Sequence, residues 1–365
     1  MTIRAETQHL VLISSGPRPS AKRWARFVRP EQLHHRAQVR HVTKETDEAT
    51  SVVLAPDNGI PDSVRAGQFL TLIAQIDGQT VKRAYSLSKL PRDGTMTVTS
   101  KRVEGGVMSA YLNTRLRAGD WIQFAGPSGD FVLPAQAPDH YVFAAAGSGI
   151  TPIMAMLEQL LEQEHSRTPI TLIYGNRREQ DILFRERLDA LGGRHKNLSI
   201  RYLLSKPPKS WRGRVGRIDA AALRDAAPGS AARYYLCGPD GFNRSLRGAL
   251  VACGVPEQAI ASEQFTTLAR ESRPHPNDPH PVVFRVGGSE REVTVRPGET
   301  LLEAGLRAGV ALPFSCGHCK IKVLDGDVAT DAPNCLTEPE RQAGYALACC
   351  AYPHRQATVT VEEKV

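Results

Sequence analysis

Three short stretches of this sequence combine residue types that suit cofactor chemistry. The first, residues 83–88, reads Arg-Ala-Tyr-Ser-Leu-Ser and follows an alternating apolar run and a glycine turn, so a strand is expected there. In a strand Arg83 and Tyr85 share one face, and Ser86 and Ser88 share the other. A guanidinium beside a ring and two hydroxyls suits a phosphate-bearing flat ligand such as a flavin nucleotide. Taken alone, an ordinary strand with a packed tyrosine explains the hexapeptide better.

The second feature consists of two separate glycine-rich turns. Gly147-Ser148-Gly149-Ile150-Thr151-Pro152 follows a compact apolar strand, and Pro152 is expected to be the first residue of a helix. Ligands of parallel sheets bind at the carboxyl ends of strands, where this turn would lie. Glu104-Gly105-Gly106 precedes an amphipathic helix, whose N-terminal amides would form an anion site. A glycine turn between a strand and a helix is nevertheless common in any α/β fold.

The third stretch contains cysteines. Cys316-Gly317-His318-Cys319 is followed at a distance by Cys349-Cys350. In a cytoplasmic chain this spacing indicates a metal or iron–sulfur site. A redox dithiol is the competing interpretation, and it is weaker because no thioredoxin-like strand precedes the first pair.

Composition and charge narrow the classes of protein. The 365 residues suffice for two or three domains, and 41% apolar and 23% charged residues are ordinary for a soluble protein. We expect a cytoplasmic location, because no apolar run is long enough to span a bilayer and no signal-peptide pattern begins the chain. The net charge of +8 is uneven: residues 1–36 carry seven Lys or Arg against two acids, and residues 282–365 carry nine against eleven. This asymmetry suggests electrostatic docking, either between parts of this chain or between this chain and a partner protein. We expect no nucleic-acid partner, since no binding motif accompanies the charge.

Periodicity divides the chain into successive parts. Residues 1–36 form a basic extension in which Trp24, Phe27 and Val28 recur at helical spacing; a strap or tail is favoured over a membrane-surface helix. Short alternating runs predict an antiparallel β-barrel over residues 37–136. Alternating strands and helices predict a doubly wound parallel sheet over residues 137–269. Four prolines mark residues 270–281 as a linker, and residues 282–365 form an α+β domain.

The expected elements follow from the same patterns. We expect strands at residues 50–54, 68–74, 81–87, 96–101, 121–125, 141–146, 170–174, 198–204, 234–237, 260–265, 282–286, 292–295 and 357–362. We expect helices at residues 153–163, 181–191, 220–226, 241–253 and 301–308.

The motifs together resemble a known family. Residues 83–88 and 147–152 and the turn Cys237-Gly238-Pro239 stand in the order found in the ferredoxin–NADP⁺ reductase superfamily. The C-terminal domain resembles a plant-type [2Fe–2S] ferredoxin, which implies a β-grasp fold. The combination is similar to the fused reductase components of oxygenase and desaturase systems, and the likeness covers about residues 37–365.

The resemblance implies roles for particular residues. The flavin, FAD or FMN, would be bound by the residues of the first motif and the first glycine turn: Arg83, Ala84, Tyr85, Ser86, Gly105, Gly106 and Ser109. The nicotinamide nucleotide would be bound by Gly147, Gly149, Thr151, Pro152, Cys237 and Gly238. Glu263 and Phe265 would close the flavin site, and Ser86, Cys237 and Glu263 would be the catalytic residues.

Basic residues after two strands bear on the choice of coenzyme. Arg177-Arg178 follows the strand expected at 170–174, and Ser205-Lys206 follows the strand expected at 198–204. Cations at these positions suit a 2′-phosphate, so Arg177, Ser205 and Lys206 favour NADPH over NADH. The alternative, that these residues are only solvent-exposed loop residues with no ligand, is nearly as well supported.

The cysteine loop departs from the ferredoxin pattern C-x₄-C-x₂-C with a remote cysteine. The residues before Cys316 match those that precede the first ligand of the pattern, and the residues after it match those that follow the second ligand. The loop therefore reads as though five residues, one of them a cysteine, were missing. The resemblance assigns Cys316, Cys319 and Cys349 as ligands, with Cys335 the preferred substitute for the fourth and Cys350 or His318 as alternatives. Cys350 is disfavoured because it would point away from Cys349 in an extended segment. We therefore expect an impaired cluster.

The favoured function is an NAD(P)H-dependent flavoprotein reductase that passes electrons through a [2Fe–2S] domain to a terminal oxygenase, hydroxylase or desaturase. A flavin suits this task because it accepts a hydride and releases electrons singly. One alternative is a flavin-only diaphorase with a cluster-deficient ferredoxin domain. A second alternative is a non-enzymatic interaction scaffold with vestigial sites.

Overall fold

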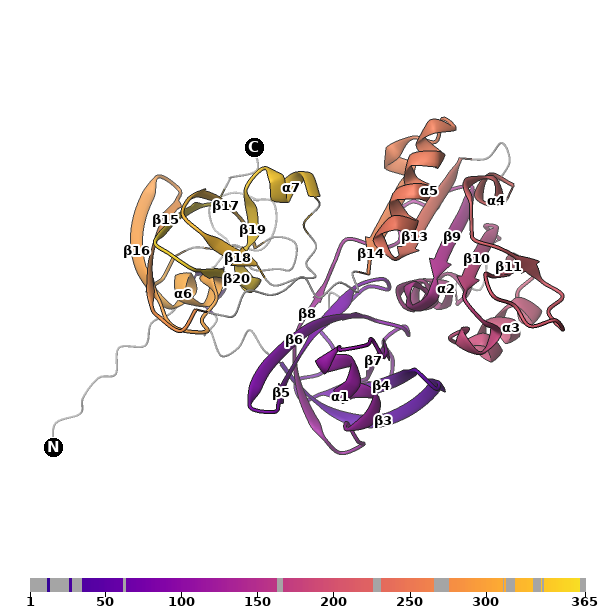
Figure 1. Ribbon diagram of the computed structural model, residues 1–365, viewed down its shortest axis with the longest axis horizontal. Helices are drawn as coiled ribbons and strands as arrows, with labels where there is room; N and C mark the ends of the chain where they lie inside the picture. The colour runs from indigo at the N-terminus through magenta and orange to yellow at the C-terminus, as the bar shows by residue number, and fades with distance from the viewer. Residues whose placement is uncertain are drawn as a thin grey trace. The chain divides into compact units, whose positions relative to one another are not determined.

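The structure is a computed structural model that describes residues 12–13, 26–27, 35–61, 64–162, 167–225, 231–265, 276–310, 312, 319–330, 336 and 338–361. Two compact units make up the chain: Arg36–Leu268, and a unit of Met1–His35 with Ala269–Val365 (Figure 1).

An antiparallel six-stranded sheet begins the larger unit, in the order β6-β5-β8-β3-β4-β7. Its strands are β3 (His35–Thr46), β4 (Ala49–Pro56), β5 (Phe69–Ile76), β6 (Gln79–Ser86), β7 (Met96–Lys101) and β8 (Trp121–Ser128). The sheet closes into a barrel where Leu87 bridges Val98 and the Ser88 amide donates to the Thr97 carbonyl at 2.9 Å. Strand β3 was not expected from the sequence, because only Ala37 and Val39 along it are buried apolar residues.

Helix α1 (Val107–Thr114) packs against strands β4 to β7 of the barrel. Met108 and Leu112 are buried on the helix face that joins the barrel core. Asn113 is buried beside them and donates to the Ser100 carbonyl at 3.1 Å, which ties the helix to the end of β7. The helix and its preceding glycine turn are thereby fixed on the barrel.

A six-stranded parallel sheet follows, in the order β12-β11-β10-β9-β13-β14. Its strands are β9 (His140–Ala146), β10 (Ile170–Asn176), β11 (Leu198–Leu204), β12 (Arg214–Val215), β13 (Ala232–Gly238) and β14 (Ile260–Gln264). Its helices are α2 (Ile150–Leu161), α3 (Arg185–Arg194), α4 (Ala220–Arg224) and α5 (Asp240–Ala252). Helices α2 and α3 share one apolar core with one sheet face, and α4 and α5 share another core with the opposite face. The doubly wound expectation is confirmed (Figure 1).

Two helix starts differ from expectation. Helix α2 begins at Ile150, directly after a 3₁₀ turn over Gly147–Gly149, so Pro152 is its third residue and not its first. Proline is accommodated there because the amides of the first helical turn have no intrahelical partner. Helix α3 begins at Arg185, four residues later than expected, because Phe184 adopts a left-handed conformation with φ of 57°.

The barrel and the parallel sheet pack together within the larger unit. Ala49 and Phe131 belong to the same buried cluster as Phe143 of β9 and Met156 of α2. Beside this apolar core, the Glu158 carboxylate accepts a hydrogen bond from the Leu90 amide of the barrel at 3.0 Å. Glu158 also forms an ion pair with Arg187 of α3. The two domains are therefore joined by apolar packing and by the hydrogen bond between Leu90 and Glu158.

The second unit contains a mixed five-stranded sheet in the order β16-β15-β21-β17-β19, in which only β15 and β21 pair in parallel. Its strands are β15 (His280–Val286), β16 (Ser289–Val295), β17 (Lys320–Asp325), β19 (Tyr345–Leu347) and β21 (Ala357–Thr360). The remaining elements are the strand pair β18 (Val328–Thr330) and β20 (Ala351–Pro353) and the helices α6 (Leu301–Arg307) and α7 (Glu338–Gln342). This is an α+β arrangement with its own apolar core, as the β-grasp expectation requires.

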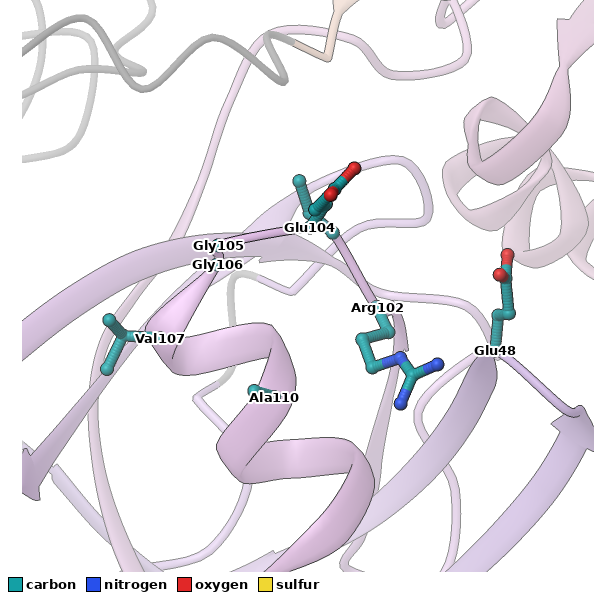
Figure 2. A pocket seen from close by; sticks show the side chains of 8 residues that line it. Glu48, Arg102, Glu104, Gly105, Gly106, Val107 and Ala110 are labelled. Carbon is teal, nitrogen blue, oxygen red and sulfur yellow. The ribbon is translucent and has the colours of Figure 1, made fainter.

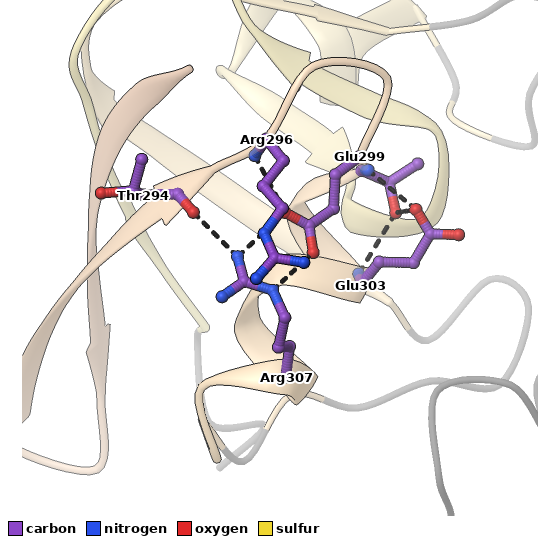
Figure 3. A network of polar contacts seen from close by, with 6 residues as sticks. Thr294, Arg296, Glu299, Glu303 and Arg307 are labelled. Carbon is purple, nitrogen blue, oxygen red and sulfur yellow. Dashed lines mark hydrogen bonds and ion pairs between the residues drawn. The ribbon is translucent and has the colours of Figure 1, made fainter.

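A polar network fixes α6 to the sheet of this unit (Figure 3). Thr300 and Glu303 form a reciprocal capping box at the helix start. At the helix end, Arg307 donates to the Glu299 carboxylate at 2.7 Å and to the Thr294 carbonyl at 2.8 Å. Burial by itself would raise the pKa of Glu299, but hydrogen bonds from Arg307 and the Arg296 amide hold that pKa below its usual value. Glu299 is thus a charged anchor between strand and helix.

Within the N-terminal extension, the structure describes one pair of short strands. Strands β1 (Leu12–Ile13) and β2 (Arg26–Phe27) pair in an antiparallel manner. The helical interpretation of this stretch is therefore wrong at Phe27, while Trp24 and Val28 lie outside the described residues. Among the described helices of the whole chain, none has the length and apolar character needed to cross a membrane.

Candidate functional site

The seam between barrel and parallel sheet brings together residues that are far apart in the sequence. Ser86 ends β6, and its hydroxyl donates to Oε2 of Glu263 on β14 at 2.9 Å. Glu263 pairs in register with Cys237 on the neighbouring strand β13. The three expected catalytic residues therefore lie around one point at the carboxyl ends of β13 and β14.

The surroundings of this point disfavour ionisation of its two acidic groups. Burial raises the pKa of Glu263 to about 7, and the hydrogen bond from Ser86 opposes this shift. Burial and the Glu263 carboxyl raise the pKa of the Cys237 thiol well above its usual value. Cys237 is therefore a neutral thiol at physiological pH and has no thiolate character.

On the barrel side, Tyr85 lies between the barrel core and the end of β7. It is half-buried against that core, and burial raises its pKa to about 12 despite a hydrogen bond with Ser100. The Arg83 guanidinium donates to the Lys82 carbonyl at 2.7 Å. Alternation along β6 thus separates Arg83 and Tyr85 from Ser86, as the sequence indicates.

A pocket of about 520 Å³ opens where α1 begins. It is lined by Glu48, Arg102, Val103, Glu104, Gly105, Gly106, Val107 and Ala110. Figure 2 shows the Arg102 side chain between α1 and Glu48. Gly105 has φ of +69°, a conformation that glycine adopts without strain, and it turns the chain into the helix.

This pocket fits a phosphate-bearing cofactor. Bare glycine backbone, the N-terminal amides of α1 and the Arg102 guanidinium are all suited to a pyrophosphate. Ser109 does not line it: its hydroxyl accepts from the Val103 amide at 3.1 Å and donates to the Gly106 carbonyl at 3.0 Å. Ser109 holds the turn, and Arg83 is not among the lining residues. Arg102 was missed in the sequence because no motif accompanies it.

The glycine turn Gly147–Gly149 after β9 packs directly on the end of β13. A Cβ atom at Gly149 would lie 2.0 Å from the Cys237 carbonyl oxygen, so only glycine permits this approach. The Thr151 hydroxyl donates to the Ser148 carbonyl at 3.0 Å, and the buried Tyr174 hydroxyl donates to the Gly147 carbonyl at 2.9 Å. Tyr174 was missed because it stands in an apolar strand and has the sequence pattern of a core residue.

The basic residues expected beside the coenzyme lie at neighbouring strand ends. The Ser205 amide donates to the Asn176 carbonyl at 3.1 Å, and the Lys206 amide donates to the Arg177 carbonyl at 2.8 Å. Arg177, Ser205 and Lys206 are exposed there. This arrangement leaves their side chains accessible to a ligand at the carboxyl edge of the sheet.

The last strand of the sheet is tied to the Gly238 turn. The Phe265 amide donates to the Gly238 carbonyl at 3.1 Å, and the Phe265 side chain is half-buried against the shared core. Asn243 of α5 donates to the Glu263 carbonyl at 2.8 Å. Asn243 was also missed, because nothing in the sequence of its helix distinguishes it.

Two expected cluster ligands converge in the second unit. Cys319 is buried just before β17, and its Sγ lies 3.2 Å from Sγ of Cys349. Two thiolates on one tetrahedral ion with bonds of 2.3 Å are about 3.7 Å apart, so this pair suits binding to one metal ion. Cys316 and Cys335 lie outside the described residues, and within the described ranges no group of three potential ligands occurs.

The segment around Cys349 is not extended. Ala348–Cys350 form a 3₁₀ turn, so the reason for which Cys350 was disfavoured, an extended backbone that points it away from Cys349, is wrong. Both cysteines are half-buried.

Comparison with known proteins agrees with this architecture. The sequence matches three family descriptions in succession: an oxidoreductase FAD-binding domain over residues 57–133, an oxidoreductase NAD-binding domain over residues 143–248, and a 2Fe-2S iron-sulfur cluster binding domain over residues 284–354.

Two relatives match most of the length of this chain. The chain is 33% identical over 339 residues to a component of the 1,2-phenylacetyl-CoA epoxidase of Escherichia coli K12, covering 87% of this chain and 95% of that protein. It is 30% identical over 332 residues to the ferredoxin reductase component of 3-ketosteroid-9-alpha-monooxygenase of Rhodococcus rhodochrous, covering 86% and 92%. Among solved structures, the FAD/NAD-binding domain of a Vibrio cholerae nitric oxide dioxygenase matches with a TM-score of 0.58 and 27% identity, over 63% of this chain and 98% of that chain.

The fold and site define an oxidoreductase with FAD-, NAD- and 2Fe-2S-binding domains, and not a non-enzymatic scaffold. The chain belongs to the ferredoxin–NADP⁺ reductase superfamily, as a reductase fused to a C-terminal plant-type [2Fe–2S] ferredoxin domain.

The raised pKa of Glu263 predicts a pH-dependent effect of Glu263→Gln on stability. Because the folded-state pKa of about 7 exceeds the usual 4.5, the contribution of this carboxyl is complete below pH 4.5 and is lost as the pH rises through 7. Glutamine mimics the protonated form, so the variant should match the parent near pH 4.5 and have a higher unfolding midpoint above pH 7. Thermal unfolding of both proteins across this range measures the difference, and a constant offset at every pH would contradict the assignment.

Proposed function

We propose that this protein is the NAD(P)H-dependent reductase component of a terminal oxygenase, hydroxylase or desaturase. The observation that carries the proposal is the junction of Ser86, Cys237 and Glu263 at the seam between the flavin barrel and the nucleotide sheet. Relatives described as components of a phenylacetyl-CoA epoxidase and a ketosteroid monooxygenase support an oxygenase as the electron acceptor. Contact of residues 1–36 with a membrane surface stays a prediction.

The residues at the seam position the two ligands for hydride transfer. A bound flavin supplies the conversion of a two-electron donor into single electrons. Gly149 lets the glycine turn pack on the Cys237 carbonyl, and this close packing supports a role for Cys237 beside a bound nicotinamide. Ser86 presents its hydroxyl from the flavin side, and Glu263 orients that hydroxyl through the 2.9 Å hydrogen bond. Such positioning of two reactants removes much of the entropic cost of the reaction.

The flavin site is assigned to Arg83 and Tyr85 on β6 together with the glycine pocket at α1. Arg83→Ala should weaken flavin binding, because a charge-assisted phosphate contact is worth about 1.5–3 kcal/mol. Arg102→Ala should weaken it as well, since Arg102 lines the pocket. Arg115→Ala is the control: Arg115 forms an exposed ion pair with Asp77 on the same barrel and should leave affinity unchanged. Flavin retained after dialysis is the measurement, and full occupancy in Arg83→Ala would refute the role of Arg83.

The coenzyme is assigned as NADPH, on the strength of the exposed Arg177 and Lys206 at adjacent strand ends. We expect kcat/KM for NADPH to exceed that for NADH, and Lys206→Ala to reduce the ratio several-fold by removing a partner of the 2′-phosphate. Lys209→Ala, which changes an exposed lysine of the same loop, is the matched control. A preference for NADH in the parent protein would overturn the assignment.

The cysteine spacing favours a second candidate function, a flavin-level diaphorase whose ferredoxin domain holds its cluster poorly. Cys319 and Cys349 are positioned as a pair, and the sequence supplies Cys316 with Cys335 as substitute for the missing ligand. The shortened loop also removes backbone that would surround a cluster.

Metal content distinguishes the two functions. Protein purified without oxygen should contain less than two iron and two sulfide per chain, and Cys335→Ser should lower both further. Insertion of five residues with a cysteine after Cys316 should restore them, together with one-electron transfer to a protein acceptor. Stoichiometric iron and sulfide in both the parent chain and Cys335→Ser would show that Cys335 is not a ligand and that the loop is sufficient.

A further inference from the structure

One carboxylate joins the chain that continues from β6 of the barrel to the helix that follows the glycine turn of the parallel sheet. Oε2 of Glu158 accepts a hydrogen bond from the Leu90 amide at 3.0 Å. Leu90 lies four residues beyond Ser86, the last residue of β6. Glu158 lies on α2, which begins directly after the turn Gly147–Gly149. The hydrogen bond therefore links the two segments to which the flavin and the nicotinamide are assigned.

On the barrel side, the loop that carries Leu90 is fixed at both ends. Before Leu90 in the chain, Leu87 bridges Val98 of β7. Two residues after Leu90, Arg92 bridges Thr95. The Leu90 side chain is half-buried and packs against the apolar core that the barrel and the parallel sheet share. The position of the Leu90 amide is therefore coupled to the position of the end of β6.

On the helix side, an ion pair orients the Glu158 carboxylate. The Glu158 side chain is only 13% exposed and pairs with Arg187 of α3. Burial lowers the pKa of Arg187, and the Glu45 carboxylate on β3 of the barrel opposes this shift. Arg187 thus interacts favourably with a carboxylate from each domain. Its contact with Glu158 keeps that carboxylate in place for the Leu90 amide.

We propose that Glu158 is a positioning residue for hydride transfer, an inference that rests on the proposed function. The flavin and the nicotinamide are assigned to different domains, so a contact that fixes the end of β6 against α2 also fixes the distance between them. Hydride transfer needs reacting atoms about 3–3.5 Å apart, and a misplacement of about 1 Å can cost about 100-fold in rate. Glu158 acts through the Leu90 amide, and this role needs an acceptor oxygen and not a charge.

Variants of the flavin-loaded full chain separate positioning from stability. The double variant Glu158→Leu with Arg187→Leu removes the acceptor without leaving a buried charge unpaired, and such an apolar pair is often as stable as the ion pair that it replaces. Glu158→Gln keeps an acceptor oxygen for the Leu90 amide. Glu162→Gln is the matched control. Glu162 follows the last residue of α2 and forms an exposed ion pair with Arg92 of the barrel, and exposed pairs contribute little.

The measurements are the rate constant of flavin reduction at saturating NADPH or NADH by stopped flow, the Kd of the nucleotide and the unfolding midpoint. The double variant should reduce its flavin about tenfold more slowly, with Kd and midpoint close to those of the parent. Deuterium at C4 of the nicotinamide should slow that reduction further, because hydride transfer is the step affected. Glu158→Gln should keep the rate constant but have a lower midpoint, since Arg187 loses its charged partner. Glu162→Gln should match the parent in every measurement.

The contrary outcomes are distinct. If neither nucleotide reduces the flavin of the parent, the proposed function fails. If the parent is reduced and the double variant is reduced equally fast, the inference about Glu158 is wrong, whether or not the midpoint changes. A slower reduction without an isotope effect places the defect in another step and also overturns it. If rate constant and midpoint both fall in the double variant, an intact rate constant in Glu158→Gln supports positioning through Leu90, and an equal loss there refutes it.

Discussion

The hydrogen bond between Ser86 and Glu263 is the contact on which the arrangement of the site depends. It joins residues 177 positions apart, from the barrel and from the last strand of the parallel sheet. It forms because the two domains share one apolar core, to which Ala49 and Phe131 contribute from the barrel side and Phe143 and Met156 from the sheet. The same burial that brings the pair together raises the pKa of Glu263 to about 7. Burial at the shared core therefore explains both the position of Glu263 beside Ser86 and its raised pKa.

Polar residues near the ligand sites divide into two groups. Ser109, Thr151 and Tyr174 use their hydroxyls to hold the backbone of the glycine turns. Because these turns are fixed before any ligand arrives, little ordering cost is left to binding. Arg102 instead lines the pocket at the start of α1 and is suited to direct contact with a cofactor.

The ferredoxin domain combines an apolar core of its own with a cysteine spacing that departs from the plant-type ferredoxin pattern. Its apolar core and the Glu299–Arg307 anchor stabilise α6 on the sheet without any metal. Cys319 and Cys349 stand as a pair suited to one metal ion, whereas Cys316 lies outside the described residues. The contacts that hold α6 on the sheet therefore do not involve the cysteines.

The sequence by itself determined the class of the protein, because its decisive features are local. Glycine turns, the change of period after residue 136 and the cysteine spacing each depend on adjacent residues, and they predicted the barrel, the parallel sheet and the ferredoxin domain. The polar strand β3, the start of α2 two residues before Pro152 and the 3₁₀ turn at Cys350 were not predicted, since tertiary packing overrides weak local preferences there. Only the tertiary structure decided that Ser86 meets Glu263 and that Tyr174 supports the Gly147 turn. These contacts depend on which strand ends become neighbours, and no local pattern encodes that.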